Sequence, residues 1–114
     1  MIGCGTISGV HLEAIRAHEG ADLVAVCDAD TGRVAPVAEQ YGVLGFGGHR
    51  ELLEEVRPDV VHICTPHDQH VPVAVDCLDA GVHVLVEKPV AATVAEAERL
   101  IEAADRHPEV KAGI

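Results

Sequence analysis

Short apolar runs alternate with segments of helical periodicity along the whole sequence. The runs that predict strands are Met1–Ile2, Leu23–Cys27, Val43–Phe46, Val60–Cys64, Val82–Val86 and Val110–Ile114. The segments between them place apolar residues three and four positions apart, which predicts helices. Strands that alternate with helices are typical of βαβ units and a parallel sheet. We therefore predict one α/β domain over residues 1–114, built on a doubly wound parallel sheet.

The apolar spacing predicts five helices. These helices cover residues 7–19, Thr31–Tyr41, a short segment with Leu52, Leu53 and Val56, a segment carrying Val71, Ala74, Val75 and Leu78 up to Gly81, and a last helix from Thr93. In the first helix we expect Val10, Ala14 and Ala17 to form the apolar stripe that faces the core. Pro36 lacks an N–H donor, so we expect an irregular or kinked first turn in the second helix. The spacing in Thr93-Val94-Ala95-Glu96 predicts a capping box.

The first strand is unusually short. Only Met1 and Ile2 precede a pair of glycines, whereas strands usually run about five or six residues. In a doubly wound sheet this strand is central, so its missing half would leave apolar neighbours poorly packed. We therefore expect the strand to continue ahead of Met1.

A glycine turn follows this strand, in Gly3-Cys4-Gly5-Thr6-Ile7-Ser8. Gly3 allows a sharp turn, and Gly5 leaves room for a pyrophosphate to approach the backbone. Backbone N–H groups at Thr6 and Ile7, near the positive end of a helix dipole, would face that anion. A single match of this kind also occurs in tight strand–helix turns that bind nothing, and that alternative stays open.

An aspartate at the end of the second strand strengthens the dinucleotide interpretation. Asp28 lies near the spacing of about 20 residues expected for the acid that binds the adenosine ribose hydroxyls. A carboxylate there would repel a 2′-phosphate, which favours NAD over NADP. The alternative is that Asp28 or Asp30 only caps the next helix, and Asp30 is the better candidate for that cap.

The fourth strand ends in Thr65-Pro66-His67-Asp68-Gln69-His70. Ligands bind at the carboxyl edge of an open α/β sheet, so we expect Thr65, Pro66, His67 and His70 to line the nicotinamide side of a bound cofactor. The two histidines could instead form a metal pair, but no third ligand accompanies them nearby. A helix start with exposed imidazoles is the other alternative.

Glu87, Lys88 and Pro89 follow the fifth strand directly. A lysine at this edge can donate to a substrate oxygen or exchange a proton with it. Glu87 can orient that lysine or bind the nicotinamide ribose. Pro89 fixes the backbone, and a cis bond before it is one way to do so. The alternative is a surface ion pair at a strand end.

Charge and cysteine usage narrow the classes of partner. The formal net charge is −11, which disfavours nucleic acid and acidic membrane surfaces. No apolar run approaches the length of a membrane-spanning helix. The four cysteines form no Cys-x-x-Cys pair and fit no zinc spacing, so we expect free thiols, no metal site and a cytoplasmic location. His11 and His18 are expected to be exposed or packing residues rather than ligands.

Taken together, these motifs resemble the nucleotide-binding domain of the Gfo/Idh/MocA oxidoreductases, the glucose–fructose oxidoreductase and inositol dehydrogenase family. The residues that carry the resemblance are Gly3–Ser8, Asp28, Thr65-Pro66 with His70, Ala80-Gly81 with His83-Val84, and Glu87-Lys88-Pro89. They extend over essentially the whole chain.

The resemblance implies an NAD(P)-dependent oxidoreductase acting on a sugar, a polyol or a similar small molecule, with Lys88 as the catalytic lysine. The family's second, α+β domain, which holds substrate and often mediates homo-oligomerisation, is absent from these 114 residues. We therefore expect this chain alone to bind the cofactor at best. Two alternatives remain open: an NAD-dependent glycosidase of the same fold, and a non-catalytic nucleotide-binding fragment.

Overall fold

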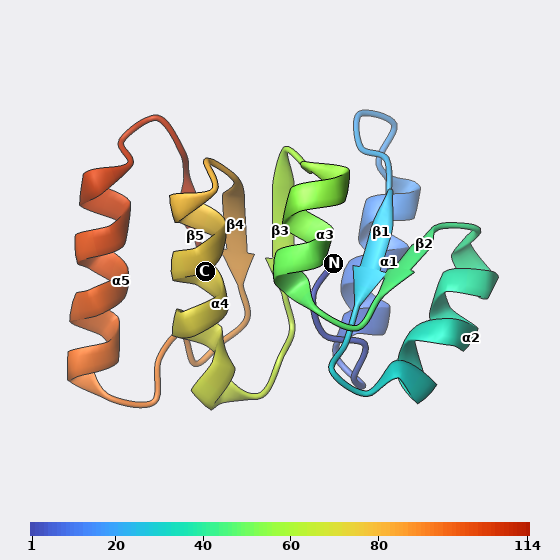
Figure 1. Ribbon diagram of the computed structural model, residues 1–114, viewed down its shortest axis with the longest axis horizontal. Helices are drawn as coiled ribbons and strands as arrows, with labels where there is room; N and C mark the ends of the chain where they lie inside the picture. The colour runs from blue at the N-terminus through green and yellow to red at the C-terminus, as the bar shows by residue number, and fades with distance from the viewer.

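The computed structural model describes residues 1–114 and shows a parallel sheet between two layers of helices (Figure 1). The labelled strands are β1 (Ala25–Cys27), β2 (Leu44–Phe46), β3 (Val60–Ile63), β4 (His83–Val86) and β5 (Ala112–Gly113). All three labelled strand pairs, β1–β2, β3–β4 and β4–β5, are parallel. Parallel strands need crossover connections, and the helices between successive strands supply them.

Ile2 is the centre of the sheet although it forms only isolated bridges. It pairs in parallel with Cys27 of β1 and with Ile63 of β3. The order across the sheet is therefore β2, β1, Ile2, β3, β4 and β5. This is the doubly wound order with its switch point beside the first strand, as the sequence predicted.

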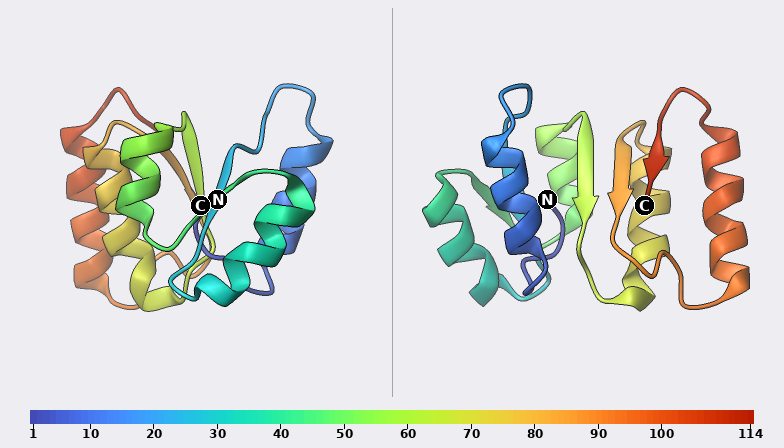
Figure 2. Two further views of the ribbon diagram at one scale, coloured as in Figure 1. Left: turned by 45° about the vertical axis from the view of Figure 1, so that its right-hand side comes forward. Right: turned by 180° about the vertical axis from the view of Figure 1, so that it is seen from behind.

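The helices divide between the two faces of the sheet according to the half of the fold to which they belong (Figure 2). They are α1 (Ser8–Ala17), α2 (Thr31–Tyr41), α3 (His49–Val56), α4 (His67–Asp79) and α5 (Val94–Arg106). The helices α1 and α2 cover one face, and α3, α4 and α5 cover the other. Right-handed crossovers that proceed in opposite directions across the sheet, toward β2 in the first half and toward β5 in the second, produce this division.

The core consists of one apolar cluster on each face. The larger cluster includes Ile2, Ile63 and Leu78 on the side of α3, α4 and α5. The smaller cluster includes Met1 and Leu12 on the side of α1 and α2. Because successive side chains of a strand point to opposite faces, neighbouring residues such as Met1 and Ile2 belong to different clusters.

The predicted stripe of the first helix is wrong. Val10 is 67% exposed, and Ala14 and Ala17 are also exposed, whereas Ser8 and Leu12 are buried. Leu12, with Ile15 packed beside it, offers more apolar surface than the alanine stripe, and this larger side-chain area sets the rotation of the helix.

Three further details differ from the prediction. The helix α4 begins at His67, so His67 and His70 belong to its first turn and not to a preceding loop. The helix α2 runs without a break through Pro36, whose missing donor lies on the exposed side of the helix. The last strand is shortened to Ala112–Gly113.

Candidate functional site

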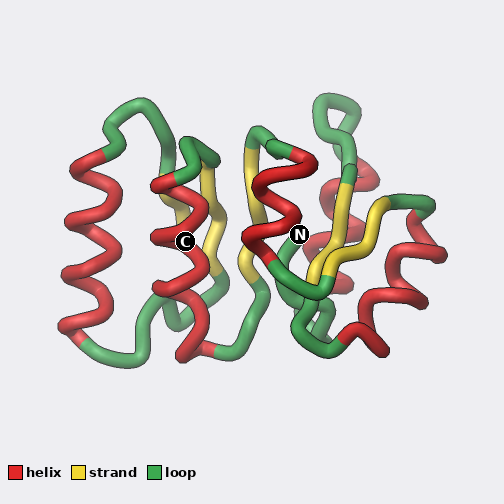
Figure 3. Tube along the Cα trace, in the orientation of Figure 1, coloured by secondary structure: helices red, strands yellow, loops and turns green.

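A cleft of about 510 Å³ opens at the carboxyl edge of the sheet. Its walls come from the turn after Ile2 and from the loops that follow β1, β2 and β3. Figure 3 shows these loops gathered at one edge, below the strands in that view. Among the residues that line the cleft are Gly3, Gly5, Asp28, Thr65 and Pro66. The fold therefore brings together the glycine turn, the aspartate and the Thr-Pro loop, which are far apart in the sequence.

The surroundings of Gly3 and Gly5 differ. Gly3 has φ +95°, and an added Cβ would lie 2.5 Å from the carbonyl carbon and oxygen of Cys64. Both the backbone conformation and the close approach of the next loop therefore exclude a side chain there. At Gly5 an added Cβ would meet no protein atom within 4 Å. The free space at Gly5 belongs to the cleft, so a ligand can approach this backbone.

The N-terminus of α1 faces the same cleft without a side-chain cap. Ile7 is the cap residue and makes no side-chain hydrogen bond, and Thr6 and Ile7 line the cleft. Ser8 Oγ donates to Gly5 O over 2.6 Å, which holds the turn closed. Backbone donors at a helix start, combined with the helix dipole, favour an anion at this position.

Asp28 connects the loop after β1 to the glycine turn. Its Oδ2 accepts from Cys4 N at 2.8 Å, and its Oδ1 accepts from Asp30 N at 2.9 Å. A carboxylate can accept further hydrogen bonds beyond these two, so Asp28 can still bind a diol. Asp30 is the helix cap, because its side chain accepts from Gly32 N at 3.0 Å. The cap prediction for Asp30 is thereby confirmed.

The Thr65–Pro66 loop reaches the cleft, but the two histidines after it do not. His67 is exposed at the start of α4. His70 is only 1% exposed, and its ring nitrogens lie 2.8 Å from Pro89 O and 2.8 Å from Thr65 O. Both nitrogens thus face backbone carbonyls, so the structure corrects the expectation that His70 lines the cofactor. His70 instead joins the two loops from behind and has no nitrogen turned toward a metal.

Glu87 and Lys88 follow β4, which lies beside β3 in the sheet. The Lys88–Pro89 peptide bond is cis, as the sequence suggested. Lys88 is exposed and forms no ion pair, and the partner of Glu87 is His11 of α1. The alternative interpretation, a surface ion pair between Glu87 and Lys88, is therefore wrong. Neither side chain lines the cleft, and both lie on the loop after β4, at the carboxyl edge of the sheet.

A chain of polar side chains holds Glu87 in place, and sequence reasoning missed it. His11 Nε2 lies 2.8 Å from Glu87 Oε1, and His11 Nδ1 lies 3.1 Å from His62 Nδ1. The hydrogen bond from His11 holds the pKa of the Glu87 carboxyl below its ordinary value. Burial lowers the pKa of His62 and favours its neutral ring. His11 is therefore neither a simple surface residue nor a ligand, but a link between α1 and the loop that carries the lysine.

Further lining residues also escaped the sequence analysis. These are Arg33, Gly47, Gly48, His49 and Gln69. The paired glycines directly after β2 are a signal that could have been used, because they mark the carboxyl end of a strand at the ligand edge. Arg33 gave no signal in the sequence; it lies in the first turn of α2, where its Nε is 3.3 Å from Asp30 Oδ2.

The arrangement fits one class of ligand. An open backbone at Gly5, helix-terminal donors and a carboxylate at the end of the next strand match the pyrophosphate and ribose of a dinucleotide. The fold and the cleft thus define a dinucleotide-binding domain of the Rossmann type.

Comparison with known proteins specifies this class further. Residues 1–112 match the family model described as "Oxidoreductase family, NAD-binding Rossmann fold". Inositol 2-dehydrogenase of Rubrobacter xylanophilus is 36% identical over 104 residues, covering 90% of this chain and 30% of that protein. D-glucoside 3-dehydrogenase of Escherichia coli is 33% identical over 114 residues, covering 98% of this chain and 32% of that protein.

A solved structure agrees with these sequence matches. The WlbA dehydrogenase from Bordetella pertussis, in complex with NADH and UDP-GlcNAcA, superposes with a TM-score of 0.93 at 30% identity. The match covers 97% of this chain and 34% of that one. The chain belongs to the Gfo/Idh/MocA oxidoreductase family and is its NAD-binding Rossmann domain. It spans about a third of the length of the relatives that it matches. None of its helices is long and apolar enough to cross a membrane.

Proposed function

We propose that the complete protein is an NAD-dependent dehydrogenase that moves a hydride between the nicotinamide and a hydroxyl-bearing or carbonyl carbon of a sugar, a polyol or a related small molecule. The observation that supports this most is the cleft itself, which joins the glycine turn, Asp28 and Thr65-Pro66 at one edge. In this proposal the present chain binds the cofactor.

Each part of the cleft has a separate task in this proposal. Gly3 and Gly5 shape the turn, and the N–H groups of Thr6 and Ile7 bind the pyrophosphate. Asp28 accepts hydrogen bonds from the adenosine ribose hydroxyls, which favours NAD over NADP. When bound, the oxidised cofactor supplies a two-electron acceptor next to the Thr65–Pro66 loop.

Two residues of the neighbouring loop complete the cofactor and substrate contacts. Lys88 handles the proton that accompanies hydride transfer: in oxidation its neutral amine accepts the proton of the substrate hydroxyl, and in reduction its ammonium returns a proton to the carbonyl oxygen. Glu87 is held by its hydrogen bond with His11 and fixes the position of this loop. In this proposal Glu87 also binds the nicotinamide ribose. Exposure of the lysine leaves it accessible to a substrate. His67, exposed at the start of α4, is a further proposed contact on the nicotinamide side.

The relatives' names suggest the substrate class. Inositol and D-glucoside dehydrogenases act on polyhydroxylated rings, and we assign a ring or chain of the same chemistry to this protein. A second domain would hold that substrate and mediate homo-oligomerisation. We place the enzyme in the cytoplasm, where thiols such as the free cysteines stay reduced.

The test is to exchange Lys88 for alanine in the complete protein. Loss of proton transfer should lower kcat by about a hundredfold or more. The affinity for NAD should stay unchanged, because the amine does not line the cofactor cleft. Arg99→Ala, an exposed position on α5, is the matched control and should keep full activity. Unchanged turnover of the Lys88 variant would remove the lysine from the mechanism.

A further inference from the structure

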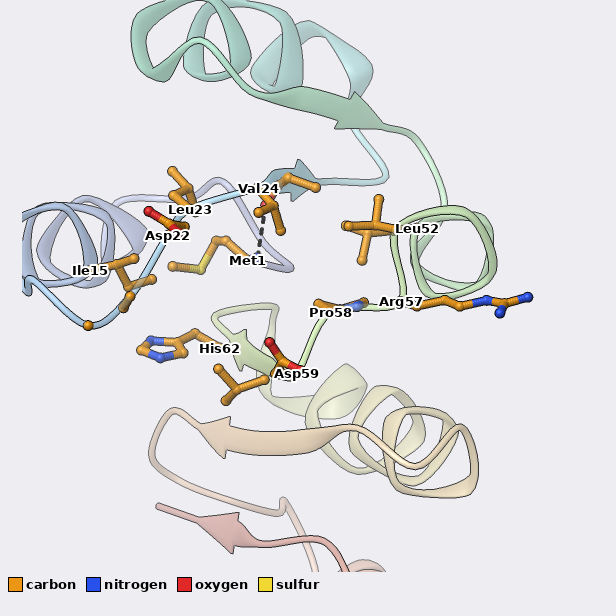
Figure 4. A pocket seen from close by; sticks show the side chains of 15 residues that line it. Met1, Ile15, Asp22, Leu23, Val24, Leu52, Arg57, Pro58, Asp59 and His62 are labelled. Carbon is orange, nitrogen blue, oxygen red and sulfur yellow. Dashed lines mark hydrogen bonds between the residues drawn. The ribbon is translucent and has the colours of Figure 1, made fainter.

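Three side chains from separate parts of the fold form a hydrogen-bonded network beside the loop that carries Lys88. His62 lies on β3, His11 lies on α1, and Glu87 directly follows β4. Figure 4 shows the His62 ring projecting from its strand toward α1, on the same side as Ile15. His11 is the middle member, since its Nδ1 lies 3.1 Å from His62 Nδ1 and its Nε2 lies 2.8 Å from Glu87 Oε1. Both ring nitrogens of His11 are therefore engaged.

The partners of His11 decide which of its nitrogens carries the proton. An ionised carboxylate can only accept, and the hydrogen bond from His11 holds the pKa of Glu87 below its ordinary value, so Nε2 is the donor. A neutral imidazole has a single N–H, so Nδ1 of a neutral His11 must accept from His62. The proton between the two rings then belongs to Nδ1 of His62, which thereby fixes the tautomer of His11.

The surroundings of His62 favour the neutral ring that this arrangement needs. Burial lowers the pKa of His62, and the charges of His11 and of the terminal ammonium of Met1 act in the same direction. The network is also shielded from water, because only 13% of the His11 side chain and 23% of the Glu87 side chain are exposed. His62 can therefore serve as a neutral donor to His11 at neutral pH.

The carboxylate of Glu87 is held at both of its oxygens. Oε1 faces His11, and Oε2 accepts from the backbone N–H of Lys88 at 3.3 Å. The ammonium of Lys88 is exposed and forms no ion pair, although its charge acts on Glu87. Burial, followed by the Glu87 charge, raises the pKa of the nearby Cys64 thiol to about 11, so this thiol stays uncharged at neutral pH. The carboxylate is therefore bound to α1 and to the backbone, and not to the lysine amine.

We propose that His11 and His62 are positioning residues of the dehydrogenase reaction. His11 holds the Glu87 carboxylate away from the Lys88 amine, and His62 fixes the nitrogen with which His11 does so. This inference rests on the proposed function, in which the neutral amine of Lys88 accepts the proton of a substrate hydroxyl. A carboxylate paired with the lysine would favour the ammonium form and reduce the neutral fraction at a given pH. The network thus keeps the lysine available as a base.

The kinetic test measures the pH profile of kcat for the complete protein with NAD and with inositol or a methyl D-glucoside, whichever is oxidised. In His11→Ala the midpoint of the alkaline rise should move about half a unit to higher pH, because the freed Glu87 carboxylate can pair with the exposed Lys88 ammonium. His11→Gln keeps an amide donor near the former Nε2 and should restore the midpoint. The double variant His11→Ala/Glu87→Gln should also restore it, because no carboxylate is left to pair with the lysine. A merely structural role for His11 would give no such recovery.

A second measurement is independent of turnover. Nitrogen-15 NMR shifts of the imidazole rings in the 114-residue chain report which nitrogens carry protons. At about pH 8, where neutral imidazoles prevail, we expect the protons on Nδ1 of His62 and on Nε2 of His11. His62→Phe removes the donor and should lower the share of His11 protonated at Nε2, whereas His62→Asn keeps an amide donor near the former Nδ1 and should restore it.

Two results would overturn this inference and leave the proposed function standing. One is a proton on Nε2 of His62 in the unaltered chain. The other is an unchanged pH midpoint in His11→Ala with turnover intact. Failure of the unaltered complete protein to oxidise either compound would instead count against the proposed function and against this inference together.

Discussion

Gly3 and Gly5 show how two residues of one type can serve different ends. At Gly3 the protein itself occupies the space that a side chain would need, since Cys64 lies against it. At Gly5 the space is open toward the cleft. Gly3 is therefore needed for the fold, whereas Gly5 leaves space for a ligand. Substitutions at the two positions can separate these two roles.

Gly3→Ala should destabilise the domain by about 2–4 kcal/mol, because it combines a positive φ with overlap against the Cys64 backbone. Gly5→Ala should leave the free energy of unfolding nearly unchanged and weaken NAD binding by about tenfold or more, because the methyl group enters the pyrophosphate space. Urea unfolding and calorimetry measure the two effects. Equal destabilisation by both variants would contradict this division.

The contact between His11 and Glu87 gives a second prediction for single residues. His11→Ala removes the hydrogen bond that depresses the pKa of Glu87, so this pKa should rise toward its ordinary value. Carbon-detected NMR titration of the carboxyl measures the shift. His18→Ala, an exposed change just beyond the same helix, should leave Glu87 as it is. An unchanged pKa in the His11 variant would show that the pair is not formed in solution.

The sequence predicted some of these residues and not others, for physical reasons. Asp30 as a cap and the place of Asp28 follow from strand and helix ends, which are local. The role of His70 depends on a carbonyl of the next loop, Pro89, which only the folded chain brings near. The contact of His11 with Glu87 likewise joins α1 to a distant loop. Long-range hydrogen bonds of this kind leave no periodic signal in a sequence.

At the scale of whole elements, helices with strong local signals are predicted best. The bounds of α2 match the predicted Thr31–Tyr41, where Gly42 ends the helix with φ +66°. The predicted rotation of α1 was wrong because more than one face of this helix carries apolar residues. Packing against Met1 and Val26 decides that the face with Leu12 is buried. Local signals thus fix where a helix begins and ends, whereas its orientation depends on the sheet.

The capping box of α5 provides the test at this scale. Thr93 Oγ1 accepts from Glu96 N at 3.2 Å, and Glu96 Oε2 accepts from Thr93 N at 3.2 Å. Thr93→Ala should cost about 1 kcal/mol of unfolding free energy by removing this cap. Thr93→Ser keeps the hydroxyl and should lose only a few tenths of that amount. If serine destabilises as much as alanine in urea unfolding, the hydroxyl does not cap the helix.

The whole molecule is arranged around a very short central strand. Ile2 joins the two halves of the sheet, and the cofactor cleft lies past its carboxyl end. Alternation of strands and helices was enough to predict the topology and the ligand edge.

The buried amine of Met1 predicts a pH dependence for the whole domain. Its pKa is lowered from 8.0 in the folded state by burial, so the unfolded chain binds more protons between the two pKa values. The free energy of unfolding should therefore rise with pH through this window and level off above about pH 8.

The thiols around the amine do not interfere with this measurement. Burial raises the pKa of Cys27 and of Cys64 to about 11 and that of Cys77 to about 12, and it also raises the pKa of Cys4. Relative to the chain acetylated on Met1, the free chain should be less stable at pH 6 and equally stable at pH 9. A constant difference between the two forms over this range would show that the amine is not buried in solution.

The central claim is that this chain binds a dinucleotide across the glycine turn with Asp28 at the adenosine ribose. Isothermal titration calorimetry of the 114-residue chain with NAD and with NADP tests this most directly. We predict saturable binding of NAD and binding of NADP that is weaker by about tenfold or more, because the 2′-phosphate would lie against a carboxylate. No heat of binding with NAD, or tighter binding of NADP, would contradict the account.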